Sequence, residues 1–148
     1  MPTSVKPIPD GYHTVTPYLV VDDVAKVVEF LKRAFDAKEG HRSTRPDGTI
    51  AHTEVRIGDS PVMLGAARDQ WKSMPCMIYL YVPDTDVAYK RALEAGATSL
   101  MEPANQFYGD RNAGVKDPAG NQWWIATHIE DVSPEEMEKR FAAAAGQH

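Results

Sequence analysis

The chain has 148 residues, of which 43% are hydrophobic and 25% charged, and its net charge is −5. This composition is typical of a globular domain, and the negative charge argues against nucleic-acid binding, which needs a basic face. No apolar run approaches the ~20 residues of a membrane-spanning helix, and the first residues lack the apolar segment of a secretory signal. The single cysteine, Cys76, excludes an intrachain disulfide and fits a reducing compartment. We therefore expect a cytoplasmic protein with no nucleic-acid or membrane partner.

The first half of the chain predicts a strand followed by a helix. Residues 12–21, YHTVTPYLVV, have the composition of a strand. Pro17 has no N–H to donate, so this strand should lie at a sheet edge or carry a bulge. Asp22 and Asp23 end it and cap a helix. The apolar residues of that helix recur at helical spacing, at Val24, Val27, Val28, Leu31 and Phe35.

Three strands should follow the helix, at residues 39–44, 49–57 and 62–64. In the middle strand, alternation places His52, Glu54 and Arg56 on one face and apolar residues on the other. Residues 66–75 are polar and rich in turn formers, so we interpret them as a linker.

The second half repeats this order of elements. Residues 76–82 form a strand in composition, and Pro83 to Asp86 cap a helix that should end at Gly96. The predicted apolar face of this helix consists of Val87, Ala88, Leu93 and Ala95. We expect a strand at residues 98–101 and then a long loop. Ser133-Pro134-Glu135-Glu136 is a capping box that opens a last helix to about Ala145, anchored by Met137 and Phe141.

A hairpin near the end of the second half is the most specific local signal. In Asp117–Asn121, Pro118 presets φ for a turn and Gly120 accepts a positive φ at little cost. Trp123 and Trp124 follow the turn and must point to opposite faces of one strand. One should enter the core, and we expect the other to face a ligand cavity. The two strands of the hairpin are residues 112–116 and 122–127.

The two halves therefore form an internal repeat with an offset of about 61 residues. We predict an α+β fold of paired βαβββ modules with a terminal helix. The expected layout is an arm at residues 1–11, one domain at 12–130 with modules at 12–65 and 76–128, and a helix and tail at 131–148. Neither half of about 60 residues is expected to be stable alone, so the two should bury a shared surface.

Three stretches carry a resemblance to a known family, namely TPYLVVDD, HTEVRIGDSPVML and FYGDRNAGVKDPAGNQWWIAT. With the repeat, they resemble the vicinal oxygen chelate superfamily of glyoxalase I, bleomycin-resistance proteins and extradiol dioxygenases, and within it the PhnB-like branch. The resemblance implies a cleft in each U-shaped sheet and usually a homodimer.

Enzymes of this superfamily place a divalent metal at four strand positions through His or Glu. Carried onto this chain, these positions fall on Thr16, Met63, Met77 (Ile78 if the register slips) and Trp124. Hydroxyl, thioether and indole groups do not make an oxygen and nitrogen site for such a cation. We therefore expect no metal and no cofactor.

The first functional hypothesis is metal-free binding of a small, possibly aromatic, organic molecule, as in the bleomycin-resistance proteins. An aromatic and apolar cleft with a few polar groups is typical of a ligand site. The alternatives are that these side chains fill the cleft and bind nothing, that the aromatic residues plug the sheet edge, and that the arginine orders a loop. The candidate ligand-binding residues are Thr16, Tyr18, Met63, Met77, Phe107, Tyr108, Arg111 and Trp124.

The second hypothesis is a glyoxalase-, lyase- or dioxygenase-like enzyme with a displaced site around His52 and Glu54, which share a strand face. They would act as base and orienting group, or bind a metal with His13 or His128. Arg56 and Arg111 would then hold a carboxylate or phosphate. The alternative is a solvated strand face without a role. A purely structural or protein-binding module is a third class.

Overall fold

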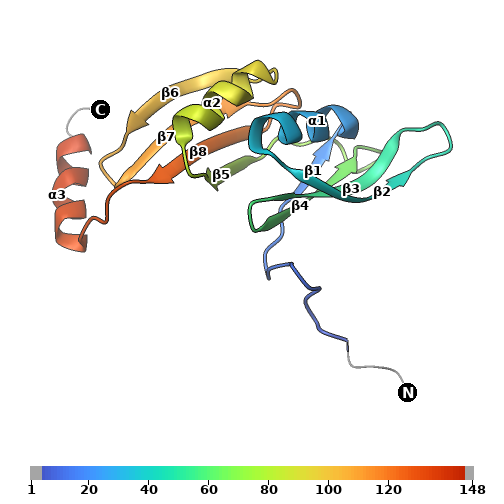
Figure 1. Ribbon diagram of the computed structural model, residues 1–148, viewed down its shortest axis with the longest axis horizontal. Helices are drawn as coiled ribbons and strands as arrows, with labels where there is room; N and C mark the ends of the chain where they lie inside the picture. Colours follow the sequence, from blue (N-terminus) through green and yellow to red (C-terminus); the bar gives the residue numbers. More distant parts are fainter. Residues whose placement is uncertain (1–4, 146–148) are drawn as a thin grey trace. The chain divides into compact units, whose positions relative to one another are not determined.

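The computed structural model describes residues 5–145 and divides between Cys76 and Met77 into two units (Figure 1). Each unit contains one four-stranded sheet and one helix on that sheet, and the second also carries the terminal helix. This is the repeated strand–helix–three-strand order that the sequence predicts, in an α+β fold. In the described part of the chain, no helix has the length and apolar character needed to cross a membrane.

In the first unit the strand order is β1-β4-β3-β2, with β1 parallel to β4 and the other pairs antiparallel. The edge position of β1 agrees with the prediction from Pro17. The elements are β1 (Tyr18–Val21), α1 (Val24–Phe35), β2 (Lys38–Thr44), β3 (Ile50–Ile57) and β4 (Ser60–Ala66).

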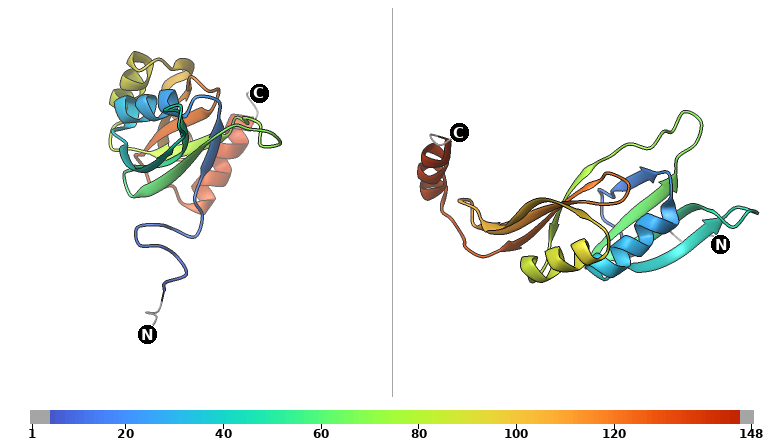
Figure 2. Two further views of the ribbon diagram at one scale, coloured as in Figure 1. Left: turned by 90° about the vertical axis from the view of Figure 1, so that its right-hand side faces the viewer. Right: turned by 90° about the horizontal axis from the view of Figure 1, so that it is seen from above.

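Helix α1 covers one face of the first sheet because its apolar stripe is continuous (Figure 2). Asp23 is the N-cap, and its side chain accepts a hydrogen bond from the Lys26 backbone N–H at 3.2 Å. Beneath the helix, Leu19 of β1 and Leu64 of β4 are buried. The residues predicted for the apolar stripe, Val24, Val27, Val28, Leu31 and Phe35, are all buried.

The second unit has the same topology, with strand order β5-β8-β7-β6 and β5 parallel to β8. Helix α2 contacts β6, β7 and β8. Figure 2 shows the terminal helix α3 beyond the end of this sheet, not against either of its faces. The elements are β5 (Met77–Tyr81), α2 (Thr85–Glu94), β6 (Thr98–Asn105), β7 (Asp110–Lys116), β8 (Gln122–His128) and α3 (Pro134–Ala145).

The turn between β7 and β8 is held by the buried carboxylate of Asp117. It accepts hydrogen bonds from the backbone N–H of Ala119 and Asn121 at 2.8 and 3.0 Å, and from Nε1 of Trp123 at 2.9 Å. Trp123 is fully buried, whereas Trp124 on the opposite face is partly exposed. The predicted hairpin and the opposite orientation of its tryptophans are therefore confirmed.

Two predicted strand boundaries were wrong for identifiable reasons, and the predicted apolar face of one helix was partly wrong. Strand β1 begins at Tyr18, not at residue 12, because the ladder starts beside Pro17, which accepts a bond from Met63 but donates none. Strand β6 continues through Pro103, where a loop was expected, since an edge strand tolerates proline. In α2 the buried residues are Thr85, Ala88 and Ala92, whereas Val87 and Leu93 are 54% and 36% exposed.

The terminal helix α3 begins at the predicted capping box, and the Ser133 hydroxyl accepts from the Glu136 N–H at 3.2 Å. Its attachment is mostly electrostatic. Arg140 makes a two-bond ion pair with Glu130 at 2.8 Å and donates to the Phe107 carbonyl at 3.1 Å. The predicted anchor Phe141 contacts the Phe107 ring but is 58% exposed, and none of the twelve α3 residues is buried.

Candidate functional site

The face of the first sheet that α1 leaves uncovered, here called the first open face, collects several of the predicted site residues. Strand alternation places Leu19 and Val21 under α1, so Tyr18 and Val20 lie on the opposite side. The strand register continues this face into β4 and β3. The residues on the first open face are Tyr18, Val20, His52, Glu54, Met63 and Gly65.

A glycine at the centre of this face lets Tyr18 reach His52. Gly65 pairs with both Val20 and His52, and a Cβ added to it would overlap the Tyr18 hydroxyl. The Tyr18 ring therefore crosses β4, and its hydroxyl lies 3.3 Å from Nδ1 of His52. The two ring centroids are 5.7 Å apart. Tyr18 and His52 thus form a polar aromatic pair on the first open face.

A pocket of about 290 Å³ opens on one side of this pair. A tight turn forms its far wall, because Arg68 and Trp71 exchange backbone hydrogen bonds at 2.8 and 2.7 Å. The Arg68 guanidinium lies over the Trp71 ring, 5.2 Å from its centroid, at a distance typical of cation–π contact. The pocket is lined by Tyr18, Val20, Gly65, Ala66, Arg68 and Trp71.

The segment interpreted as a linker therefore forms a wall of this pocket. Its two ends are tied to β1, since Ala67 donates to the Val21 carbonyl at 2.8 Å and Met74 to the Val20 carbonyl at 3.2 Å. Sequence reasoning missed both Arg68 and Trp71. The available signal was a tryptophan within an otherwise polar turn, which suggests a contact with another part of the fold.

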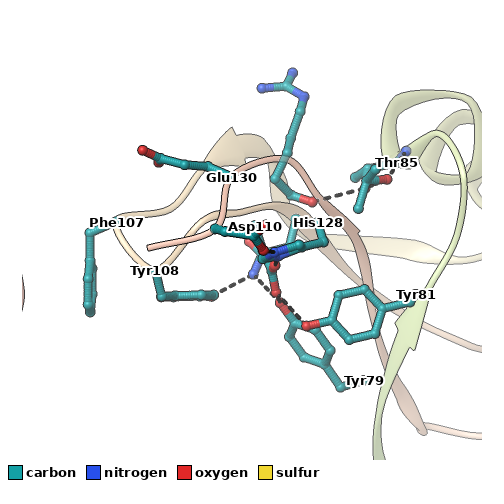
Figure 3. A network of polar contacts seen from close by, with 12 residues as sticks. Tyr79, Tyr81, Thr85, Phe107, Tyr108, Asp110, His128 and Glu130 are labelled. Atoms are coloured by element: carbon teal, nitrogen blue, oxygen red, sulfur yellow. Dashed lines mark hydrogen bonds and ion pairs between the residues drawn. The ribbon is translucent and has the colours of Figure 1, made fainter. Parts of the chain in front are cut away.

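The corresponding face of the second sheet, here called the second open face, carries a network of polar contacts (Figure 3). At its centre, the buried Asp110 carboxylate accepts from the hydroxyls of Tyr79 and Tyr81 at 2.7 and 2.9 Å. His128 bonds to Asp110 through Nδ1 at 2.9 Å and to Asp131 through Nε2 at 2.7 Å.

The network extends from Tyr79 toward the start of β7. Asn112 donates to the hydroxyls of Tyr79 and Tyr108 at 3.1 and 2.6 Å and accepts from Gln106 at 3.1 Å. The predicted ligand residue Tyr108 is thus a member of this network. Tyr79 and Asp110 were not predicted, although Tyr79 and Tyr81 alternate within a strand that the sequence does predict.

The pKa values in this network follow from its contacts. Burial alone raises the pKa of Asp110, but hydrogen bonds from Tyr79, His128 and Tyr81 outweigh it, so the pKa is lowered. Hydrogen bonds to Asp110 and Asp131 raise the pKa of His128. Burial and the bond to Asp110 raise the pKa of Tyr79. The network therefore favours an ionised Asp110 among neutral tyrosines, with His128 inclined to carry a proton.

Trp124 also lies on the second open face, as the predicted alternation requires. Its ring lies over Gly114 of β7, where a Cβ would overlap it, and its Nε1 donates to the Gln122 side chain at 3.2 Å. Phe107 instead contacts Tyr108 and Phe141, with ring centroids 5.2 and 6.0 Å away. It therefore joins the β6–β7 connection to α3.

Arg111 lies on the opposite side of β7 from Asp110 and Asn112, on the side covered by α2. It makes a two-bond ion pair with Asp86 at 2.6 and 2.9 Å and donates to Asn105 at 3.0 Å. The structure therefore does not bring Arg111 together with Tyr108 and Trp124.

Met63 of β4 and Trp124 of β8 are two of the four predicted metal positions, and the strand register shows which residues of β1 and β5 lie beside them. Met63 pairs with Tyr18, and Trp124 pairs with Tyr79. Thr16 precedes β1, and Met77 is 66% exposed and pairs with Gln122. Thr16 and Met77 therefore lie two residues before Tyr18 and Tyr79, the strand partners of Met63 and Trp124.

The donor chemistry at these register positions does not suit the family's metal ion. Two phenols, a thioether and an indole, from Tyr18, Tyr79, Met63 and Trp124, lack the imidazole and carboxylate donors such an ion needs. Within residues 5–145, His, Cys, Asp and Glu form no group of three or more able to hold a metal.

The residues proposed for a displaced catalytic centre have different surroundings. His52 and Glu54 share the first open face, opposite Gly65 and Met63. His13 hydrogen-bonds to the Asp59 carbonyl at 3.0 Å. Arg56 donates to the Gly11 carbonyl at 3.1 Å, and His128 belongs to the network of the second unit.

Comparisons with known proteins agree with this architecture. Residues 12–125 match the model of the Glyoxalase/Bleomycin resistance protein/Dioxygenase superfamily. An uncharacterized protein of Mycobacterium bovis is 38% identical over 140 residues, covering 87% of this chain and 92% of the relative. A relative in Mycobacterium tuberculosis is also 38% identical, covering 87% and 82%.

Solved structures show the same fold. TioX from Micromonospora sp. ML1 has a TM-score of 0.69 and 23% identity, covering 79% of this chain and 99% of its own. A glyoxalase/bleomycin resistance protein/dioxygenase from Nocardioides has a TM-score of 0.62 and 18% identity, covering 89% and 90%. At these identities the likeness concerns the fold alone.

Proposed function

Because the chain belongs to the Glyoxalase/Bleomycin resistance protein/Dioxygenase superfamily, we propose that it binds a small flat organic molecule without a metal ion. The proposed site is the pocket beside the first open face. The observation that carries the proposal is a pocket of about 290 Å³ bordered by the rings of Tyr18 and Trp71. The superfamily includes both enzymes and resistance proteins, so the function must be argued from the site.

The size and lining of the pocket suit such a ligand. Sites for small molecules span roughly 300–1,000 Å³ and combine apolar walls with a few polar groups. This pocket lies at the lower limit, which favours a molecule of one or two fused rings. Val20 and Ala66 add apolar surface, and the Tyr18 and Trp71 rings offer faces on which a planar molecule can stack.

The test is a titration of purified protein with 2-naphthol, a neutral bicyclic probe, followed by tryptophan fluorescence and melting temperature. Binding to the folded state raises the melting temperature. Metal content is measured on the same sample. Saturable quenching should be lost in Trp71→Ala and kept in Trp124→Ala, because Trp71 lines the pocket and Trp124 is not among its lining residues.

Two results would contradict the proposal. One is the absence of binding by 2-naphthol and by a wider set of planar metabolites and drugs. The other is a requirement for one tightly held divalent metal per chain.

A second candidate function is catalysis at His52, and the observation that favours it is the 3.3 Å approach of the Tyr18 hydroxyl to Nδ1 of His52. A histidine in contact with a phenol beside a pocket can transfer a proton to or from a bound substrate. Glu54, on the same face, would complete the centre. Formation of lactoylglutathione from methylglyoxal and glutathione, abolished by His52→Ala, would favour this alternative.

Four further expectations belong to the proposal. We propose a PhnB-like protein, a homodimer and a cytoplasmic location. We also propose that residues 12–130 act as one domain, with modules at 12–65 and 76–128. Sedimentation equilibrium of the purified chain would test the dimer, and cell fractionation would test the location.

A further inference from the structure

We propose that the pocket selects an anionic aromatic molecule, such as a planar aromatic carboxylate, and that Arg68 determines this specificity. The inference rests on the proposed function, since it names the class of ligand for the same pocket. It follows from the charges that line the pocket, from the partners of Arg68, and from the geometry of its guanidinium.

The lining of the pocket carries one formal charge, which is positive. Of its six lining residues Arg68 is charged, and the others are apolar, glycine or neutral aromatic. Glu54 lies on the same sheet face but opposite Met63 and outside the lining. The chain as a whole has a net charge of −5, so the positive charge is a local property of this pocket.

Arg68 differs from three other arginines of the chain, which a carboxylate holds in an ion pair. Arg42 is paired with Glu39, Arg111 with Asp86 and Arg140 with Glu130. Within the described residues, no carboxylate lies within ion-pairing distance of Arg68, although Asp69 is its neighbour in the turn. The guanidinium therefore keeps its side-chain N–H donors for a ligand.

The contact of Arg68 with Trp71 leaves the guanidinium N–H groups available to a ligand. The central guanidinium carbon of Arg68 lies 5.2 Å from the centroid of the Trp71 ring. A planar guanidinium that lies flat on a ring keeps its N–H groups in the plane, where they point outward. This edge matches the two oxygens of a carboxylate. A ligand whose ring stacks between Tyr18 and Trp71 would place an acidic substituent at that edge.

The experiment compares three probes that share one ring system and differ in charge: 2-naphthoate, 2-naphthamide and 2-naphthylmethylammonium. In the unmodified protein, 2-naphthoate should bind at least about tenfold more tightly than 2-naphthamide, because charge-assisted bonds exceed neutral ones. The cation should bind most weakly. Arg68→Gln should bring 2-naphthoate to the affinity of 2-naphthamide, and Arg68→Lys should keep part of the preference.

Lys72→Gln is the matched control, since it removes a cation from the same loop but outside the pocket lining. It should leave the preference intact, and the melting temperatures of all variants verify their folding. Equal binding of 2-naphthoate and 2-naphthamide, or a preference that survives Arg68→Gln, overturns this inference and leaves the proposed function standing. Failure of all three probes to bind overturns this inference, and the proposed function falls with it if 2-naphthol and the wider set of planar molecules also fail to bind.

Discussion

The two open faces are built from the same strand order, yet they differ in how their polar groups are satisfied. On the second open face, Asp110 accepts from three side chains, and Asn112 links two tyrosines. Beside the first open face, Arg68 stacks on Trp71 at the wall of a pocket and has no carboxylate partner within the described residues. The polar groups of the second face bond to one another, and we propose that Arg68 beside the first face is available for a ligand.

A glycine shapes each face, with different results. Gly65 lets Tyr18 cross to His52, next to the pocket. Gly114 accepts the Trp124 ring, which covers that part of the strand. The comparison teaches that a shared topology does not determine a shared function, because single side chains decide whether a face is filled or left open.

The largest effect should come from breaking the network of the second open face. Asp110→Ala removes a buried charged acceptor and leaves the Tyr79 and Tyr81 hydroxyls without their partner. We expect the free energy of unfolding to fall by about 3 kcal/mol, measured by urea denaturation. The affinity for 2-naphthol should not change in the folded variant.

The exposed pair of Asp86 and Arg111 provides the control for this variant. Asp86→Ala breaks an ion pair at the surface and should cost at most about 1 kcal/mol. If Asp110→Ala were as mild as Asp86→Ala, the network would not be a main source of stability for the second unit. If Asp110→Ala abolished probe binding while the protein stayed folded, the division of roles between the two faces would be wrong.

The next effect concerns the pocket. Trp71→Ala removes one aromatic wall of the pocket. We expect the affinity for 2-naphthol to fall at least about tenfold, because the ligand loses a stacking surface and the apolar area buried against it. Because Trp71 is half exposed, the stability of the fold should change little. Isothermal titration and urea denaturation measure the two quantities. Unchanged affinity would show that the turn at residues 68–71 is not a wall of the binding site.

Gly65→Ala tests whether the position of the Tyr18 ring on the first open face matters for binding. The added methyl would displace the Tyr18 ring and separate its hydroxyl from His52. We expect a several-fold loss of probe affinity with some loss of stability, since a forced shift of a packed side chain costs roughly 1–3 kcal/mol. Gly48→Ala is a control in which no atom lies near the new methyl, so only its positive φ opposes the change. Full probe affinity in Gly65→Ala would count against a role for the position of Tyr18.

Much of the fold could be predicted from the sequence because its signals are local. The cap at Asp23, the apolar stripe of α1 and the turn at Asp117 each depend on residues that are close together in the sequence. The repeated order of elements follows from the same signals. Boundaries failed where the pairing of distant strands decides them, as in β1 and β6.

The site was less predictable because it depends on register and on a loop. Met63 lies beside Tyr18 and not beside Thr16 because of the parallel pairing of β1 with β4, which no local pattern encodes. The position of Trp71 depends on backbone hydrogen bonds from Ala67 and Met74 to β1. By contrast, the separation of Arg111 from the second open face follows from strand alternation alone.

The pH dependence of stability should also differ between the units. The folded pKa of His128 is raised, so its contribution is complete below its unfolded value of about 6.5 and disappears as pH rises through the folded value. The folded pKa of Asp110 is lowered, so its contribution is present above about 3.9 and is lost as pH falls through the folded value. The network on the second open face should therefore stabilise the folded protein most at a pH of roughly 4 to 6.5.

The first unit has a different dependence. A hydrogen bond from Arg42 lowers the pKa of Glu39 to about 2 against the opposing effect of burial. Its contribution is present above its ordinary value and is lost as pH falls toward about 2. The urea concentration at the midpoint of unfolding should fall above about pH 6.5, and this fall should be absent in His128→Gln. The midpoint should also fall at acid pH, and this fall should be smaller in Glu39→Gln. An unchanged alkaline loss in His128→Gln would assign it to another group.

The smallest effect is expected for Tyr18→Phe, which keeps the ring at the pocket and removes only the hydroxyl near His52. At 3.3 Å on a half-exposed face, this bond should contribute no more than about 1 kcal/mol to stability. If the pocket only binds, stacking on the ring persists, and the affinity for 2-naphthol should stay within about twofold. If Tyr18 and His52 instead transfer a proton in a reaction, the same variant should lower turnover by about a hundredfold or more while binding persists. Parallel measurement of affinity and of lactoylglutathione formation in Tyr18→Phe and His52→Ala therefore separates a binding site from a catalytic one at a single pair of side chains.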